Sequence, residues 1–274
     1  MHKVLSFIKS TIAYSMSITT LIFTFVPESW FELGFITVNF ESDFIVFCNR
    51  ISTLLCSFVM VSVVKILHNS FRKSLTIAGN RYSIVVEYGN IFDKADCKKV
   101  IAFDECYTTQ LGEAPHEIKR NSICGQFLEN NPDININELI SQTGLSPQRK
   151  HSDFQSKDCY ESGRLLPCQD YLLMSFVKLD NIGLGRLTRE EYSKSLDVMW
   201  EEIDKYYAGK SVAIPILGSG ITRFRDEMMT QQQLLDIIIA SYKMSPHKIN
   251  KPAKLHIVCR ESDEFSLNKI GEYI

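Results

Sequence analysis

The chain has 274 residues, of which 45% are hydrophobic and 23% charged, and its formal net charge is −2 at pH 7. This balance excludes a nucleic-acid binder that works through bulk positive charge, and it equally excludes an acidic disordered tail or a low-complexity chain. The charges are unevenly placed, because residues 10–64 hold only five charged side chains while the rest of the chain is rich in them. This distribution predicts a lipid-embedded first part and a water-exposed second part.

Two apolar runs predict a transmembrane hairpin within residues 1–70. The first run, about 4–26, contains Lys9 as its only charged residue. At about 1.5 Å per residue it covers about 34 Å, enough for a hydrocarbon core of about 30 Å. The second run, about 44–67, is interrupted near its start by Asn49 and Arg50, whose long side chain could reach the headgroups. The alternatives are a single span with a buried helix, or a cleaved signal peptide, although no small-x-small cleavage site follows the first run.

The charges that flank these runs predict their orientation. The link 27–43 carries four carboxylates and no lysine or arginine, whereas both outer flanks are basic. The positive-inside rule then places both termini in the cytoplasm, as a multi-pass protein of the cell inner membrane, with everything after His68 cytoplasmic. The flanking cations are Lys3, Lys9, Lys65, Arg72 and Lys73.

Six cysteines are scattered through the second part of the chain. They include no C-x-x-C motif and have no histidine at zinc spacing, so the sequence indicates neither a disulfide framework nor a metal cluster. We interpret them as reduced thiols, most of them structural. They are Cys97, Cys106, Cys124, Cys159, Cys168 and Cys259.

From residue 80 onward, short apolar runs alternate with helical patterns, which predicts a three-layer α/β/α domain over residues 80–274. Thr188 and Glu191 form a predicted capping box at the start of one helix. The segment 143–158, within a larger insertion 143–168, is rich in Ser, Gln, Lys and Pro and predicts a mobile loop. The predicted strands are 82–86, 100–103, 171–177, 212–217 and 255–258. The predicted helices are 188–207, Gln231–Met244, a weaker one from Ser122 and a short one over 137–142.

Three small-residue turns follow predicted strands or begin predicted helices, where open α/β sheets bind ligands. The sharpest is Gly218-Ser219-Gly220, which follows an apolar strand and can present successive N–H groups to a phosphate. It is neither a P-loop nor a dinucleotide G-x-G-x-x-G motif, and a turn that merely needs positive φ is the alternative. The other two turns are residues 121–127 and 88–91.

Four motifs together carry a resemblance to a known family. YGNIF at 88–92, VIAFDEC at 100–106, SICGQF at 122–127 and IPILGSGITRF at 214–224 resemble the corresponding segments of macro domains. With the two preceding spans, their order resembles the membrane-anchored macro-domain effectors of bacterial Thoeris anti-phage defence. The resemblance implies a macro-like fold that binds an ADP-ribose-type nucleotide signal, with no further cofactor and no metal.

The resemblance also implies partners and an outcome. A TIR-domain enzyme makes the signal, such as histidine–ADP-ribose, and the effector binds it without catalysis. The effector then assembles as a homo-oligomer and disrupts membrane lipid, with no role for nucleic acid. The alternatives are a membrane-tethered ADP-ribosyl hydrolase of macro type and a pore-forming protein whose assembly domain binds no ligand.

Residue by residue, the resemblance implies a ligand site. Asn90 falls where macro domains place an aspartate against the adenine amine, and it offers an acceptor without charge. Asp104 and Glu105 fall in the loop that faces the distal ribose, where hydrolytic members carry asparagine. Arg223 and Arg225 both follow the second phosphate turn, and we expect one or the other to steer the anion; a surface arginine without that role is the alternative. The predicted ligand-binding residues are Asn90, Ile91, Asp104, Glu105, Ser122, Ile123, Cys124, Gly125, Gln126, Leu217, Gly218, Ser219, Gly220, Ile221, Thr222, Arg223 and, near the adenosine, Phe224.

Overall fold

A computed structural model describes residues 2–32, 42–114, 116–149, 151–154, 156–220, 223–224, 228–262 and 265–270. The chain divides into two compact units, Met1–Arg72 and Lys73–Ile274, which are treated separately below. The first unit ends two residues after the predicted hairpin region. The second begins earlier than the predicted residue 80, because an edge strand occupies Ser74–Ala78 in what the sequence indicated as a linker.

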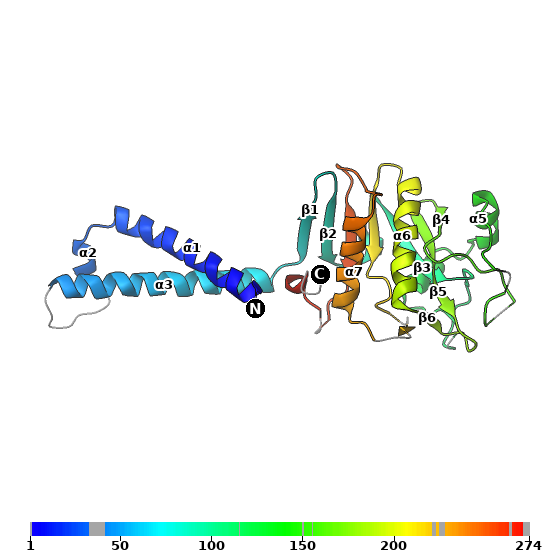
Figure 1. Cartoon of the computed structure of the whole chain (residues 1–274), viewed down its shortest axis with the longest axis horizontal. Helices are drawn as coiled ribbons and strands as arrows, with labels where there is room; N and C mark the ends of the chain where they lie inside the picture. Colours follow the sequence, from blue (N-terminus) through cyan, green and yellow to red (C-terminus); the bar gives the residue numbers. More distant parts are fainter. Residues whose placement is uncertain are drawn as a thin grey trace. The chain divides into compact units, whose positions relative to one another are not determined.

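The first unit is helical (Figure 1). Helix α3 contains the segment Asp43–His68, with a mean hydropathy of 1.9, and among the described residues it is the one helix long and apolar enough to cross a membrane by length and composition. Helix α1 covers the first apolar run without meeting that criterion, so the two-span hairpin stays a prediction. The helices are α1 His2–Phe25, α2 Ser29–Glu32 and α3 Ser42–Ser70.

Polar side chains line the contact between α1 and α3. Thr11, Ser15 and Thr19 are buried at successive turns of α1, and the Thr19 hydroxyl lies 2.8 Å from that of Ser57 on α3. Large apolar side chains of both helices, in contrast, are exposed. This is the reverse of a water-soluble helix pair, which buries its apolar stripe.

The second unit is built on a nine-stranded sheet with the order β1-β2-β9-β7-β3-β5-β6-β8, and β4 pairs with β5 outside this path. Its five central strands, from β2 to β5 in that order, are all parallel, so their carboxyl ends meet at one edge. The antiparallel partners β1, β4 and β6 lie outside this set. The strands are β1 Ser74–Ala78, β2 Ser83–Tyr88, β3 Cys97–Asp104, β4 Leu165–Cys168, β5 Tyr171–Leu179, β6 Gly185–Leu187, β7 Ser211–Pro215, β8 Arg223–Phe224 and β9 Leu255–Cys259.

Helices cover both faces of this sheet, as the predicted three-layer class requires. Along β3 the side chains alternate: Val100 packs in the core beneath α6 and α7, while Ile101 and Phe103 pack with Phe127 of α4 on the other face. Figure 1 shows α6 and α7 side by side on one face. The helices are α4 Ile123–Asn130, α5 Ile136–Thr143, α6 Arg189–Tyr206 and α7 Gln231–Met244, with short 3₁₀ turns η1 Ile91–Asp93 and η2 Leu267–Lys269.

The central strands and helices lie close to where local sequence patterns predicted them. All five predicted strands correspond to the five parallel strands, and α7 has the predicted bounds. Helix α6 begins at Arg189 because Thr188 is its N-cap, and both hydrogen bonds of the predicted capping box are present. The outer strands β1, β4, β6 and β8 were not predicted. Strands β4, β6 and β8 have only two to four residues, too few to show a periodic pattern, and β1 lies in a segment that the sequence indicated as a linker.

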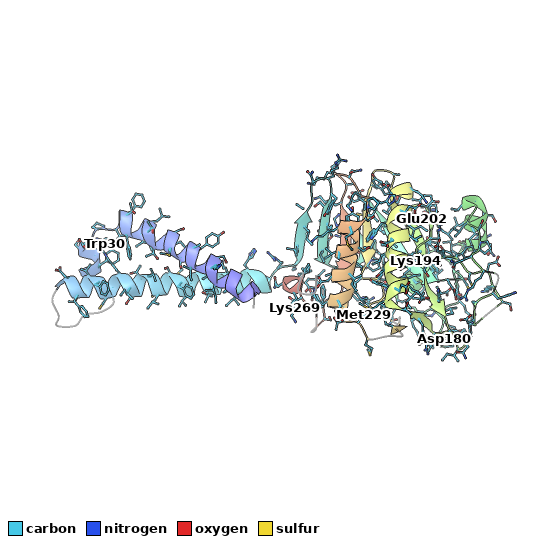
Figure 2. All side chains as sticks on the ribbon, viewed as in Figure 1. Trp30, Asp180, Lys194, Glu202, Met229 and Lys269 are labelled. Carbon is cyan, nitrogen blue, oxygen red and sulfur yellow. The ribbon has the colours of Figure 1, made fainter. Side chains whose placement is uncertain are left out.

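Buried polar contacts hold α6 in place over the sheet. Glu202, labelled in Figure 2, is 4% exposed and accepts hydrogen bonds from the Arg164 guanidinium at 3.1 Å and the Leu165 backbone N–H at 3.3 Å. Trp200 donates a hydrogen bond from its indole N–H to Ser241 of α7 at 2.8 Å. The indole therefore reports on the packing between the two helices.

We expect Thr188→Ala to lower the free energy of unfolding of the second unit by about 1 kcal/mol, because the variant loses the hydroxyl oxygen that accepts a hydrogen bond from the Glu191 N–H. The fluorescence of Trp200 in a Trp30→Phe background measures this during denaturation. Ser193→Ala, an exposed change in the same helix, is the matched control and should cost nothing. Equal stability of the two variants would contradict the capping role.

Candidate functional site

A cavity of about 540 Å³ lies at the carboxyl ends of the parallel strands. Its wall includes Asp104 at the end of β3, Leu179 at the end of β5, residues 215–220 at and after the end of β7, and Val258 with residues 260–262 at and after the end of β9. Four of the five parallel strands therefore contribute, while residues 88–91 after β2 are not part of the wall. The volume and position fit the place where open α/β sheets bind small molecules.

The first predicted turn forms part of this wall through the N-terminus of α4. Ser122 is the N-cap, and its hydroxyl oxygen accepts a hydrogen bond from the Gly125 N–H at 3.0 Å. Ser122, Ile123 and Cys124 line the cavity, so the first N–H groups of an eight-residue helix lie at its surface. Gly125 has a packing role, because a Cβ there would lie 2.2 Å from the Lys119 carbonyl oxygen.

The second predicted turn lies in the same wall. Leu217, Gly218, Ser219 and Gly220 all line the cavity. Gly218 has φ +81°, a left-handed conformation that glycine adopts without strain, whereas Gly220 needs no such conformation. The sequence had suggested a conformational need at both glycines, and the structure places it at Gly218 alone.

An aromatic pair supports this turn from behind. The Tyr192 hydroxyl donates a hydrogen bond to the Leu217 carbonyl at 3.0 Å, and its ring packs edge-on against Phe224 at 5.6 Å. A Cβ on Gly218 would lie 3.3 Å from the Phe224 ring. Phe224 is not among the described residues that line the cavity and packs behind this turn, so its contact with the adenosine stays a prediction.

Asp104 enters the cavity wall through an irregularity in β3. The register with β5 shifts between Phe103 and Asp104, and such a bulge redirects the side chain that follows it. One carboxylate oxygen of Asp104 accepts hydrogen bonds from the Cys106 N–H at 2.8 Å and the Thr108 N–H at 3.2 Å. Burial raises the pKa of Asp104 above its ordinary value, because it disfavours the charged form.

Several predicted site residues lie away from the cavity. Asn90 is exposed and its side chain caps η1, and Ile91 is buried in a small core cluster with Val258. Glu105 is 2% exposed and forms an ion pair with Arg149 at 2.7 Å, outside the cavity wall. The remaining predicted contacts, Gly125 and Gln126, follow the lining residues of α4 and are not part of the wall. Ile221, Thr222 and Arg225 lie outside the described residues, and for Arg223 only the backbone is described.

Charged residues that sequence reasoning missed complete the wall. Lys119 and Arg260 both line the cavity, and the Arg260 guanidinium donates to the Asn121 carbonyl at 3.4 Å, next to the first turn. Lys119 forms an ion pair with Glu113 at 2.9 Å. His116 and Glu117 lie in the same wall, and the hydrogen bond from the Ala114 N–H lowers the pKa of Glu117. The position of Arg260 directly after β9 was the one signal that could have indicated it.

The described residues define the second unit as a domain of the three-layer α/β class with a cavity at the carboxyl ends of parallel strands. The family described as "Thoeris protein ThsA, Macro domain" matches residues 84–260, most of this unit. The chain belongs to this family. It is also 28% identical over 226 residues to the Thoeris protein ThsA of Bacillus amyloliquefaciens (strain Y2), covering 78% of this chain and 75% of that relative.

Solved macrodomain structures from Oceanobacillus iheyensis are also similar. A macrodomain mutant is 10% identical with a TM-score of 0.41, and the match covers 74% of this chain and 94% of that one. The macrodomain with ADP is 12% identical with a TM-score of 0.39, and the match covers 73% of this chain and 92% of that one.

The two glycines of the second turn predict different outcomes when substituted. Gly218→Ala places a Cβ on a left-handed residue and against Phe224, so we expect a loss of about 1–3 kcal/mol in stability. Gly220→Val has open space around the new side chain and should fold normally, yet block close approach of a ligand to the turn. Thermal unfolding together with calorimetric titration of ADP-ribose separates the two effects. Undiminished binding by folded Gly220→Val would contradict the phosphate-turn assignment.

Asp104 predicts a pH dependence of ligand binding. Its ionised form accepts hydrogen bonds from ligand hydroxyls better than its protonated form. Because its pKa is raised, affinity for ADP-ribose should be constant above that pKa and fall as the pH drops through it. Asp104→Asn is neutral throughout, so its affinity should be lower near pH 7 and lack this acid decline. Titrations at a series of pH values test this, and parallel profiles for the two proteins would count against the role of Asp104.

Proposed function

We propose that the chain is a membrane-anchored effector of anti-phage defence whose second unit binds an ADP-ribose-derived nucleotide signal. One observation carries this proposal: the turns at 122–124 and 218–220 lie in the wall of a single cavity of nucleotide size. Two sets of backbone N–H groups on one cavity suit a diphosphate better than a single phosphate. Membership of the Thoeris ThsA macro-domain family supports the same class of ligand.

The charges around the cavity fit such an anion. Lys119 and Arg260 lie near the first turn, and a guanidinium next to a diphosphate contributes about 1.5–3 kcal/mol per charge-assisted hydrogen bond. Asp104 stands in the same wall and offers a carboxylate to the hydroxyls of a ribose. The cavity therefore combines donors for phosphate with an acceptor for sugar, as a dinucleotide-like ligand requires.

Membrane anchoring rests on the first unit. Its two long helices bury hydroxyl groups against each other and expose apolar side chains, the arrangement expected where the surrounding solvent is lipid. A two-span hairpin with both termini in the cytoplasm follows from the basic flanks and the acidic link. The sensor unit then lies on the cytoplasmic side of the inner membrane.

The signal's source and the outcome of binding complete the proposal. A TIR-domain enzyme supplies the signal, with histidine–ADP-ribose as the candidate, and ligand binding drives homo-oligomerisation and membrane disruption. The protein acts as a sensor and not as an enzyme.

Two measurements on the full-length chain in detergent test this function. Calorimetry should show binding of ADP-ribose or histidine–ADP-ribose and no binding of adenosine, which lacks the diphosphate. Incubation with ADP-ribosylated protein should release no ADP-ribose, because a sensor does not turn its ligand over. The absence of nucleotide binding would favour an assembly domain in a pore-forming protein, and turnover would favour a hydrolase.

Arg50 provides a test of coupling within this function. Its guanidinium forms an ion pair with Glu28 at 2.9 Å and lies 5.6 Å and 5.7 Å from the ring centres of Phe23 and Phe31. It thus contacts protein, as a charge within a membrane segment usually does. We expect Arg50→Leu to leave nucleotide affinity unchanged and to alter ligand-triggered leakage of dye from liposomes.

Glu28→Gln is the matched variant for this prediction. It removes the partner's charge and keeps Arg50, so it should shift leakage in the same direction as Arg50→Leu if the ion pair matters. Normal leakage by both variants would reduce Arg50 to an anchor near the headgroups.

A further inference from the structure

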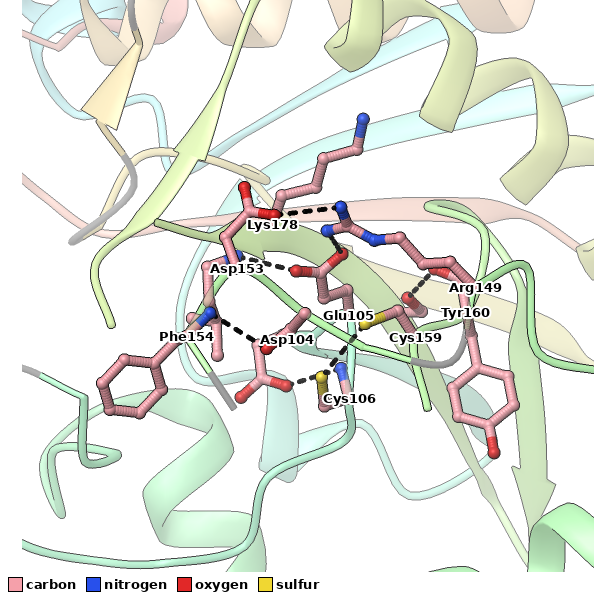
Figure 3. Close-up of polar contacts among 12 residues, drawn as sticks. Asp104, Glu105, Cys106, Arg149, Asp153, Phe154, Cys159, Tyr160 and Lys178 are labelled. Carbon is pink, nitrogen blue, oxygen red and sulfur yellow. Dashed lines mark hydrogen bonds and ion pairs between the residues drawn. The ribbon is translucent and has the colours of Figure 1, made fainter. Parts of the chain in front are cut away.

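Two buried thiols and a buried carboxylate meet beside the ligand cavity, outside its wall. The sulfur atoms of Cys106 and Cys159 lie 3.6 Å apart, although the residues are 53 positions apart in the chain. Both cysteines and Glu105 are buried, and a carboxylate oxygen of Glu105 and the two sulfurs all lie within 4.8 Å of one another. Figure 3 shows the three side chains converging, with Glu105 and Cys106 from the end of β3 and Cys159 from the insertion.

This spacing fits tetrahedral coordination. Zinc–sulfur bonds of about 2.3 Å at a tetrahedral angle separate two sulfur ligands by about 3.8 Å. The observed 3.6 Å lies close to that value before any ion is bound. Two thiolates and one carboxylate give three protein ligands, and a water molecule would complete the set.

The surroundings of Glu105 resemble the outer shell of a metal site. One carboxylate oxygen accepts a hydrogen bond from Arg149 at 2.7 Å and the other from the Leu179 backbone N–H at 3.1 Å. Each oxygen has two acceptor sites, so each keeps one for a metal ion. Hydrogen bonds of this kind orient the carboxylates that ligate metals. Arg149 therefore orients the Glu105 carboxylate and leaves it able to coordinate a metal ion.

The charge balance also allows an ion there. A cysteine thiol that binds no metal is ordinarily protonated at neutral pH, and only its thiolate form ligates a metal ion. Binding one divalent cation releases two thiol protons, and the exchange leaves the net charge of the buried cluster unchanged. Glu105 stays neutralised by Arg149 throughout.

We propose that Glu105, Cys106 and Cys159 form a binding site for one thiophilic divalent cation, with Zn²⁺ as the probe. The ion ties the insertion to the end of β3. Two backbone hydrogen bonds already join the insertion to itself and to the strand: Cys159 N–H donates to Arg149 at 2.8 Å, and Tyr160 N–H donates to Glu105 at 2.8 Å. Asp104 of the cavity wall directly precedes the site, so metal binding would fix the segment that orients it.

The test uses the full-length chain, purified in detergent with its thiols reduced. After incubation with Zn²⁺ and removal of free metal by gel filtration, elemental mass spectrometry should find one zinc per chain. Cys106→Ser and Cys159→Ser should each lose that zinc, and Glu105→Gln should retain it more weakly. Cys97→Ser, a buried cysteine on the same strand, is the control and should keep it. Trp200 fluorescence verifies that each variant is folded.

A second measurement does not depend on variants. Zn²⁺ should slow proteolysis within residues 156–160, because the bound ion ties Cys159 to the residues that follow β3, and a chelator should reverse the effect. The proposal fails if the reduced native chain retains no zinc, or if retained zinc survives both cysteine substitutions. It also fails if thiol mapping of protein purified without reductant finds a Cys106–Cys159 disulfide and the reduced chain still takes up no metal.

Discussion

The parallel alignment of five central strands is the constraint on which the rest of this protein's second unit depends. Because β2, β9, β7, β3 and β5 run in the same direction, every chain segment that leaves them does so at one edge. The start of α4 lies at the same edge, where Ser122, Ile123 and Cys124 line the cavity. The cavity wall is formed by the segments that follow these strands, and its chemistry depends on the residues in each segment.

The segments that follow β7 and β3 contribute to the cavity wall in physically different ways. After β7 the chain turns through Gly218, which lines the cavity in a left-handed conformation that favours glycine. At the end of β3 a register shift turns Asp104 toward the cavity, whereas its buried neighbour Glu105 forms an ion pair with the more exposed Arg149. Adjacent carboxylates thus have separate tasks, one at the ligand cavity and one holding the insertion.

The elements that were predicted correctly from the sequence are those that local residue patterns determine. The strongly apolar central strands and the capped helix after Thr188 were located within a few residues, because burial on both faces and capping chemistry are visible in short windows. The two turns of the cavity wall were likewise found from their small residues. Gly218 was singled out because it directly follows an apolar strand, and its φ of +81° is the left-handed conformation that such a turn needs.

The features that were not predicted from the sequence depend on tertiary contacts. Cys106 and Cys159 meet only because the insertion folds back onto β3, and no spacing rule connects residues that far apart. Arg260 reaches the cavity through the register of β9, and its position directly after that strand is the one signal that could have marked it as a site residue. Asn90 matched a family position, yet its side chain caps η1 because a local N–H is its nearest partner.

Transmission of ligand binding to a membrane, as proposed above, would require a difference in affinity between two states of the protein. A ligand shifts an assembly equilibrium only by the difference between its affinities for the two states, so tight binding alone does nothing. The donors in the cavity come from several strand ends and from α4, and a ligand that bridges them favours whichever arrangement brings them closest. In the first unit, the hydroxyl contact between Thr19 and Ser57 is of a kind worth only about 0.6 kcal/mol on average in a membrane. In the effector proposed above, a helix pair with contacts of this kind would exchange them for contacts with other copies at little cost, as assembly driven by a ligand requires.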